Sequence, residues 1–142
     1  MTDMINQPPH YITASGIEAI EVIEQYGLGL HLGCAMQYLL RAGRKGDALD
    51  DMRKASWYLC RWIDGILGRH GVEYPSANDD PEGGLSWQTP ETIADAFELT
   101  GGLREAVIYI LDEAAFAEEE GIDRIMLALD RVHVEIERVA TP

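Results

Sequence analysis

Five basic side chains lie within fourteen residues of a chain that is otherwise strongly acidic. They are Arg41, Arg44, Lys45, Arg53 and Lys54, no Lys or Arg precedes them, and the whole chain has a formal net charge of −14. Cations beside glycines, in a turn that opens a helix, can bind a phosphate group through charge-assisted hydrogen bonds and free backbone N–H groups. The spacing therefore predicts a phosphate site in a turn between two helices.

Further residues are expected to complete this site. Gln37 lies one helical turn before Arg41 on the same face, and Lys54 lies on the following helix. His10 and Tyr11 follow a Pro-Pro pair, where an imidazole and an aromatic ring can contact a base or a phosphate. The predicted ligand-binding residues are His10, Tyr11, Gln37, Arg41, Gly43, Arg44, Lys45 and Lys54. Structural alternatives stay open: that Arg41 only interacts with the helix dipole, and that Tyr11 only holds the N-terminal arm on the bundle. It also stays open that Arg44 and Lys45 are solvated surface residues, and that Arg53 and Lys54 form an ordinary solvated helix face.

Carboxylates near the basic turn form a second candidate group. Glu18 and Asp51 are the predicted metal ligands, because helical nucleotide pyrophosphohydrolases hold magnesium with carboxylates from two helices. The alternative is that the acids at residues 47–51 cap a helix and interact with its dipole. If the site is catalytic, we expect Arg41, Lys45 and Asp51 to carry the reaction.

The bulk composition excludes several classes of function. The acidic balance opposes nonspecific binding to nucleic acid or to an anionic membrane, although a small anion can still be bound locally. No apolar stretch approaches the roughly 20 residues that span a bilayer. The two cysteines, Cys34 and Cys60, form neither a disulfide framework nor a zinc spacing, and they suit a cytoplasmic protein. No P-loop or Rossmann motif occurs, so any use of ATP would not involve a Walker motif.

Hydrophobic spacing predicts an all-α fold. Ser15 is expected to cap a first helix that ends at Gly27, and further helices are expected over residues 30–42 and from Asp47 to Gly68. A short helix at 91–97, a break at Gly101-Gly102, and helices over 103–117 and 121–139 complete the chain. The expected organisation is a motif-bearing unit over 1–70, a linker over 71–89 and an acidic helical unit over 90–142, packed together as one domain.

The two units look like degenerate copies of each other. Residues 36–40 align with 107–111 at an offset of 71, and the apolar positions of the next helix align at an offset of 73. This predicts an internal duplication in which two three-helix units form a bundle. The alternative is that two amphipathic hairpins align by chance. At these offsets Arg41 becomes Asp112, so the second unit is expected to have lost the basic site.

The first half of the chain resembles a small phage-encoded helical family of unknown function. Its members commonly carry the name nucleotide kinase, after a phage enzyme without a Walker motif that acts on thymidine and deoxyguanosine monophosphates. The family usually has Asn at position 34 and Lys at position 37, where this chain has Cys34 and Gln37. The resemblance covers about residues 7–67 and rests on His10-Tyr11, Gly16-Ile17-Glu18, Ile20, Ile23, Leu32-Gly33, Tyr38, Leu40-Arg41-Ala42-Gly43, Lys45, Asp51, Lys54-Ala55 and Tyr58-Leu59.

The resemblance implies a phage protein that acts on nucleotides in the cytoplasm of the infected bacterium. We expect a nucleoside monophosphate kinase with ATP and Mg²⁺ as its co-substrate and cofactor, and self-association into a dimer or larger oligomer. Two alternatives remain: a binding protein that sequesters a nucleotide or inhibits a host factor, and a magnesium-dependent nucleotide pyrophosphohydrolase.

Overall fold

The protein is built from α-helices, as the hydrophobic spacing predicts. The computed structural model describes residues 16–42, 47–68, 88–116 and 122–141. These residues contain six helices, and none of the six is both long and apolar enough to cross a membrane. The helices are α1 (Ala19–Tyr26), α2 (Leu30–Arg41), α3 (Ala48–Ile66), α4 (Pro90–Ala96), α5 (Gly101–Phe116) and α6 (Asp123–Ala140).

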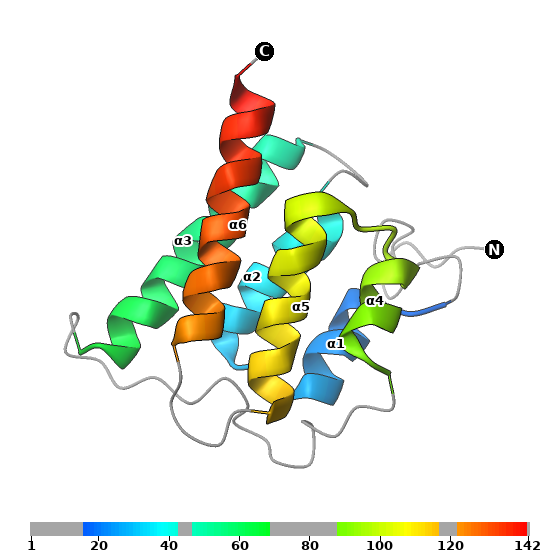
Figure 1. Ribbon diagram of the computed structural model, residues 1–142. Coiled ribbons are helices and arrows are strands. Elements are labelled where there is room, and N and C mark those ends of the chain that lie inside the picture. Colours follow the sequence, from blue (N-terminus) through cyan, green and yellow to red (C-terminus); the bar gives the residue numbers. More distant parts are fainter. Residues whose placement is uncertain (1–15, 43–46, 69–87, 117–121, 142) are drawn as a thin grey trace.

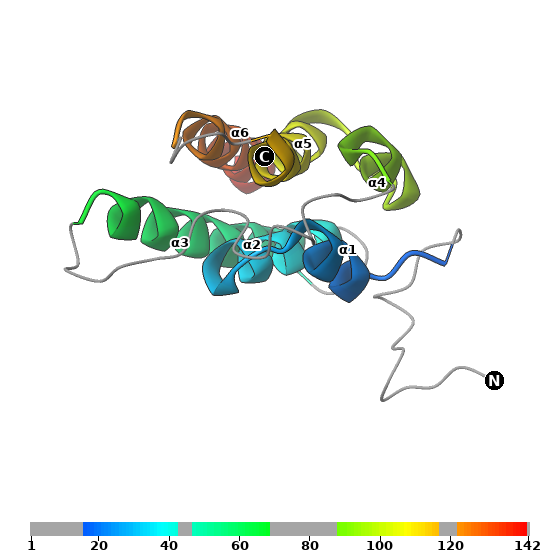
Figure 2. The ribbon, with the colours of Figure 1, turned by 90° about the horizontal axis from the view of Figure 1, so that it is seen from below.

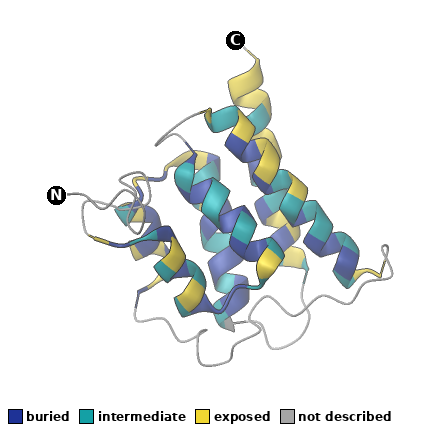
Figure 3. Ribbon diagram, turned by 180° about the vertical axis from the view of Figure 1, so that it is seen from behind, coloured by how far each residue is buried: buried dark blue, intermediate teal, exposed yellow. Residues whose placement is uncertain are grey.

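The helices pack as two layers of three. Helices α1, α2 and α3 lie side by side in one layer, and α4, α5 and α6 form the second, as Figures 1 and 2 show. Helix α3 packs on α6, and α2 packs on α5. Apolar side chains from both layers form one continuous core, and Figure 3 shows buried stretches alternating with exposed and intermediate ones along the helices. Each amphipathic helix thus buries its apolar stripe against the opposite layer.

Local capping explains where most helices begin and end. Asp47 caps α3 by accepting hydrogen bonds from the amides of Leu49 and Asp50 at 3.0 and 3.3 Å. Thr89 caps α4 in the same way, with Pro90 in the first helical position. Gly27 ends α1 in the left-handed conformation with φ of 63°, which glycine adopts at little cost. These boundaries agree with the predicted ones.

Two predicted helix starts are wrong. Helix α1 begins after Glu18, whose side chain forms a reciprocal capping box with Glu21, whereas the expected cap, Ser15, lies outside the described residues. Gly101 and Gly102 do not form a break, because they are the first two residues of α5. A Cβ added at Gly102 would lie 2.5 Å from Cγ of Glu135 on α6. Glycine is used there because the two helices approach closely.

One buried hydrogen bond joins the two layers near the first helix. The hydroxyl of Tyr26 donates to the backbone carbonyl oxygen of Gln88 at 2.7 Å, across 62 residues of sequence. Most of the predicted linker lies outside the described residues, and this bond fixes where the chain enters α4.

Candidate functional site

The α2–α3 hairpin carries a stripe of polar and aromatic side chains that is distinct from the apolar core. Its members recur every three or four residues along each helix, so they share one face of that helix. The two helices run in opposite directions, and the stripe on α2 therefore lies beside the stripe on α3. We call this set the hairpin stripe: His31, Cys34, Tyr38 and Arg41 on α2, and Asp51, Lys54, Tyr58 and Arg61 on α3.

Arg41 and Asp51 form the end of the hairpin stripe next to the basic turn. Nε of Arg41 lies 3.6 Å from Oδ2 of Asp51, which is too long for a good hydrogen bond. Asp51 is only 3% exposed, and among the residues that the structure describes neither the buried Nε nor the buried Oδ2 has a hydrogen-bond partner. Because buried polar atoms are nearly always hydrogen-bonded, this pair is an exception that calls for an explanation.

Burial dominates the electrostatics of Asp51. Loss of solvent raises the pKa of its carboxyl group, although the positive charges of Arg41 and Lys54 oppose the shift. The neighbouring acids Asp50 and Asp47 add to the increase. The carboxylate therefore lies where its charged form is poorly compensated.

Lys54 lies one helical turn further along α3. Its Nζ is 3.0 Å from Oδ2 of Asp50 and 5.5 Å from the centre of the Tyr38 ring. The hydrogen bond and charge of Asp50 raise the pKa of Lys54. Its side chain is half exposed, so this cation is available to a ligand on the hairpin stripe.

Aromatic side chains occupy the middle of the hairpin stripe. The rings of Tyr38 and Tyr58 stack with centroids 6.0 Å apart and planes inclined by 17°. His31 lies beyond them, 6.3 Å from the Tyr58 ring, and its pKa is lowered by burial and by Arg61. The neighbouring Cys34 is the main cause of a raised pKa for Tyr58. The hairpin stripe is thus basic and acidic at one end and aromatic along its length.

The structure brings some predicted site residues together and leaves others apart. Arg41, Asp51 and Lys54 lie at one end of the hairpin stripe, and the half-buried Gln37 lies one turn from Arg41 on α2. Glu18 uses its carboxylate to cap α1. Within the described ranges no group of three or more His, Cys, Asp or Glu side chains could hold a metal ion. The remaining predicted residues lie outside the described ranges: His10, Tyr11, Gly43, Arg44 and Lys45.

Sequence reasoning missed the aromatic part of the stripe. His31 and Tyr58 are not among the predicted site residues, and Tyr58 appears only among the residues of the family resemblance. The signal was present in the spacing, because residues 31, 34, 38 and 41 lie on one helical face, as do residues 51, 54, 58 and 61. Only the packing of α2 against α3 shows that the two faces meet.

The α5–α6 hairpin offers an internal comparison at the offsets of the predicted repeat. Arg41 corresponds to Asp112 and Asp51 to Arg124, so the signs of both charges are exchanged. Arg124 lies close enough to Asp112 to lower its pKa, against the larger effect of burial. Arg124 also donates to Oε2 of Glu113 at 3.1 Å. The Arg124 guanidinium is thus hydrogen-bonded to a carboxylate, whereas Nε of Arg41 has no such hydrogen bond among the described residues.

The middle of the stripe differs in the same way. Cys34 and Tyr58 correspond to Glu105 and Arg131, which form an ion pair of 3.1 Å between Nε and Oε2. The second hairpin therefore has a charged pair where the first has Cys34 and Tyr58. Nε of Arg131 is nevertheless buried without a hydrogen-bond partner among the described residues, as Nε of Arg41 is. The matching positions favour the predicted duplication, which stays a prediction.

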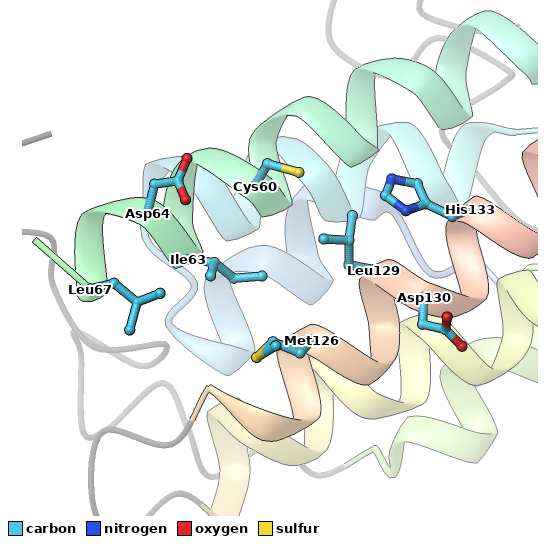
Figure 4. A pocket seen from close by; sticks show the side chains of 8 residues that line it. All are labelled: Cys60, Ile63, Asp64, Leu67, Met126, Leu129, Asp130 and His133. Carbon is cyan, nitrogen blue, oxygen red and sulfur yellow. The ribbon is translucent and has the colours of Figure 1, made fainter. Parts of the chain in front are cut away.

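A cavity of about 600 Å³ lies between α3 and α6, on another face of α3 from the hairpin stripe. Figure 4 shows Ile63 and Leu129 between the helices, with the carboxylates of Asp64 and Asp130 on either helix. These negative charges disfavour a phosphorylated ligand there. The residues lining the cavity are Cys60, Ile63, Asp64, Leu67, Met126, Leu129, Asp130 and His133.

A serine and a histidine meet beside this cavity. Oγ of Ser56 and Nε2 of His133 share a hydrogen bond of 2.8 Å. Such a pair can act as nucleophile and base, but acyl transfer also needs N–H groups directed at the developing oxyanion. Both residues lie in the middle of long helices, whose backbone N–H groups bond to carbonyls of the same helix. The arrangement therefore favours a structural tie between α3 and α6.

One family model matches the N-terminal part of the chain, which includes most of the hairpin stripe. Residues 5–60 match a family described as a protein of unknown function, DUF3310. No curated protein and no solved structure matches the chain. The matched segment contains α1, α2 and much of α3, and with them all of the hairpin stripe except Arg61; the chain is thus similar over this segment to a family whose function is unknown.

Proposed function

We propose that this protein binds a nucleotide, with the phosphate group at the end of the hairpin stripe where Arg41 meets Asp51. The observation that supports the proposal most is that the buried atoms Nε and Oδ2 have no hydrogen-bond partner in the described part of the chain. A guanidinium has five N–H donors, and Asp51 approaches it at 3.6 Å without forming a hydrogen bond. Asp51 can therefore orient Arg41 while leaving its donors for a phosphate.

The charge distribution also supports a phosphate ligand. Lys54 lies on the next turn of α3 after Asp51, and Arg44 and Lys45 follow Arg41 within four residues of sequence. Guanidinium and ammonium groups together provide bidentate hydrogen bonds and a compact positive charge. These cations are concentrated in one hairpin of a protein with a net charge of −14, so they offer the ligand a local positive site.

As an enzyme, the protein would be a nucleoside monophosphate kinase without a Walker motif. Phosphoryl transfer depends mainly on positioning and charge neutralisation, which Arg41, Lys54 and the basic turn would provide. Mg²⁺ would neutralise charge on the phosphates of ATP. Of the two proposed carboxylate ligands, Asp51 fits better, because its Oδ2 has no hydrogen-bond partner whereas Glu18 caps α1.

The alternative functions differ in whether the protein transfers phosphate and in which residues the activity requires. A sequestering protein would use the same cations and bind without transferring phosphate. A pyrophosphohydrolase would need several free carboxylates, yet Asp47 caps α3 and Asp50 pairs with Lys54. The geometry therefore favours anion binding over a cluster of metal-binding acids.

The test is calorimetric titration of the full chain with nucleoside mono-, di- and triphosphates, with and without Mg²⁺. Arg41→Ala should weaken binding by about tenfold or more, because charge-assisted hydrogen bonds contribute roughly 1.5–3 kcal/mol. Arg104→Ala is the matched control, since its side chain is 32% exposed against 31% for Arg41 and it also pairs with an aspartate. Phosphate transfer would support the kinase, and binding alone would support sequestration. No binding by any nucleotide would refute the proposal.

Self-association remains part of the proposal. Helix α6 exposes Leu127 and Val134, which are seven residues apart and so share a face. A second copy could cover this face. Light scattering on the native chain and on Leu127→Glu tests the idea, and a monomer in the native chain would contradict it.

A further inference from the structure

We infer that Trp57 on α3 is the platform on which the base of the bound nucleotide stacks. This inference rests on the proposed nucleotide site and extends it from the phosphate to the base. Trp57 is 58% exposed, although a large aromatic side chain normally buries most of its surface. Its ring meets the ring of Tyr58 edge to face, with centroids 5.1 Å apart and planes inclined by 88°. Tyr58 therefore supports the Trp57 ring and limits its rotation.

Trp57 lies beside the hairpin stripe, further along α3 than the proposed phosphate site. It is six residues after Asp51, which corresponds to about 9 Å along the axis and about 120° around it. A base stacked on Trp57 would therefore extend from Arg41 past Lys54 to the edge of the stripe. Lys54 lies between the two positions, and the Tyr38 and Tyr58 rings lie beside it on the stripe.

The charges around Trp57 are also those of a nucleotide site. Arg53 precedes it by four residues and Arg61 follows it by four, so both lie on neighbouring turns of the same face. The guanidinium of Arg61 is 6.0 Å from the centre of the Trp57 ring, a cation–π contact. Arg53 is exposed and forms no ion pair within the described part of the chain. Cations interleaved with aromatic rings are typical of surfaces that stack bases and neutralise phosphates.

The second hairpin lacks all of these features. At the offset of 73, Trp57 corresponds to Asp130, Arg61 to Val134 and Arg53 to Met126. An exposed tryptophan surrounded by cations is therefore not a requirement of the two-layer packing. It is confined to the hairpin that carries the Arg41–Asp51 pair.

The experiment compares ligands and variants in one titration series. The ligands are deoxyguanosine monophosphate, thymidine monophosphate and 2-deoxyribose 5-phosphate, which has the sugar and phosphate without a base. Trp57→Leu should weaken binding of both nucleotides by about tenfold, because stacking on an aromatic ring contributes roughly 1–3 kcal/mol per base. Trp57→Phe keeps a ring and should stay within about threefold of the native chain. The Kd for 2-deoxyribose 5-phosphate should not change in either variant.

Two controls separate this inference from the proposed function. Leu30→Ala removes the most exposed large apolar side chain of the described residues, at 71%, and should leave every Kd unchanged. Arg41→Ala should weaken the binding of all three ligands, whether or not they carry a base. Nucleotide binding that responds to Arg41→Ala and stays within twofold in Trp57→Leu overturns the inference alone. Equal losses for the base-free ligand in Trp57→Leu also overturn it, because they point to a general effect on the site. If no ligand binds the native chain, both proposals fail.

Discussion

The Nε atom of Arg41 and the Oδ2 atom of Asp51 face each other at 3.6 Å, and neither has a hydrogen-bond partner within the described ranges. The pair joins the last turn of α2 to the first turn of α3, on either side of the basic turn. A buried carboxylate that is so poorly compensated is a cost to the fold. We propose that the protein keeps this destabilising pair because the pair binds a ligand. The proposed phosphate site is therefore placed here.

The first prediction concerns the pH dependence of stability. Burial raises the pKa of Asp51 in the folded state above that of the unfolded chain. The folded protein therefore binds the proton more tightly, and this stabilising effect is lost as the pH rises through the raised pKa. Asp51→Asn should raise the free energy of unfolding at pH 7 by about 1 kcal/mol, the usual size of a single-substitution effect, because burial of the carboxylate outweighs its attraction to Arg41 and Lys54.

Chemical denaturation of the native chain and Asp51→Asn between pH 3 and pH 8 tests this prediction. The difference in unfolding free energy between the two proteins should shrink as the pH falls through the raised folded-state pKa of Asp51 toward 3.8, below which Asp51 is protonated in both states and the difference stays constant. Asp112 also has a raised pKa, but it is present in both proteins and cancels in the difference. A variant that is less stable at pH 7 would show that the attraction of Arg41 outweighs burial.

The second prediction concerns the bond between the layers. Tyr26→Phe removes the hydroxyl that donates to the carbonyl of Gln88 and leaves a buried acceptor without its partner. The free energy of unfolding should fall by about 1–2 kcal/mol, because the Gln88 carbonyl stays buried away from water but no longer accepts this hydrogen bond. Urea denaturation measures it, with Tyr109→Phe on the half-buried face of α5 as the control. Equal stability of the two variants would mean that the bond contributes nothing net.

The third prediction concerns the close approach of α5 and α6. In Gly102→Ala the new methyl group would meet Cγ of Glu135 at 2.5 Å and the carbonyl oxygen of Arg131 at 3.0 Å. Overpacking of this kind should cost about 1–3 kcal/mol, although alanine favours a helix more than glycine does. Adding Glu135→Ala should recover part of the lost stability, because the atom nearest to the new methyl group is Cγ of the Glu135 side chain. If Gly102→Ala alone were more stable than the native chain, the helices α5 and α6 would be able to move apart around the methyl group without loss of stability.

The fourth prediction concerns the thiol at the α3–α6 cavity. Burial raises the pKa of Cys60, and the charge of Asp64 adds to the increase, whereas a hydrogen bond from Ser56 opposes it. The reactive thiolate is therefore scarce at neutral pH. In a Cys34→Ser background, iodoacetamide at pH 7.5 should alkylate Cys60 about tenfold more slowly than in the urea-unfolded chain.

Asp64→Asn provides the control for this rate. Because burial is the largest cause of the raised pKa, the substitution should speed alkylation only slightly. A folded rate equal to the unfolded rate would show that Cys60 is more accessible than the cavity suggests.

The amino-acid sequence alone determined the helices and most of their ends. Asp47, Thr89 and Pro90 fix helix starts through contacts within a few residues, so local sequence is enough to predict them. The charge pattern likewise identified Arg41, Asp51 and Lys54 as candidate residues, because their concentration in one hairpin is visible without any coordinates.

Tertiary packing decided what these residues contact. Gly102 looked like a helix breaker, and only the approach of α6 shows why glycine opens α5. The stacking of Tyr38 on Tyr58 and the burial of Asp51 beside Arg41 depend on how α2 packs against α3. Helical periodicity places residues on a face, but it does not say which face of a neighbouring helix they meet, because that depends on packing the core of both layers together.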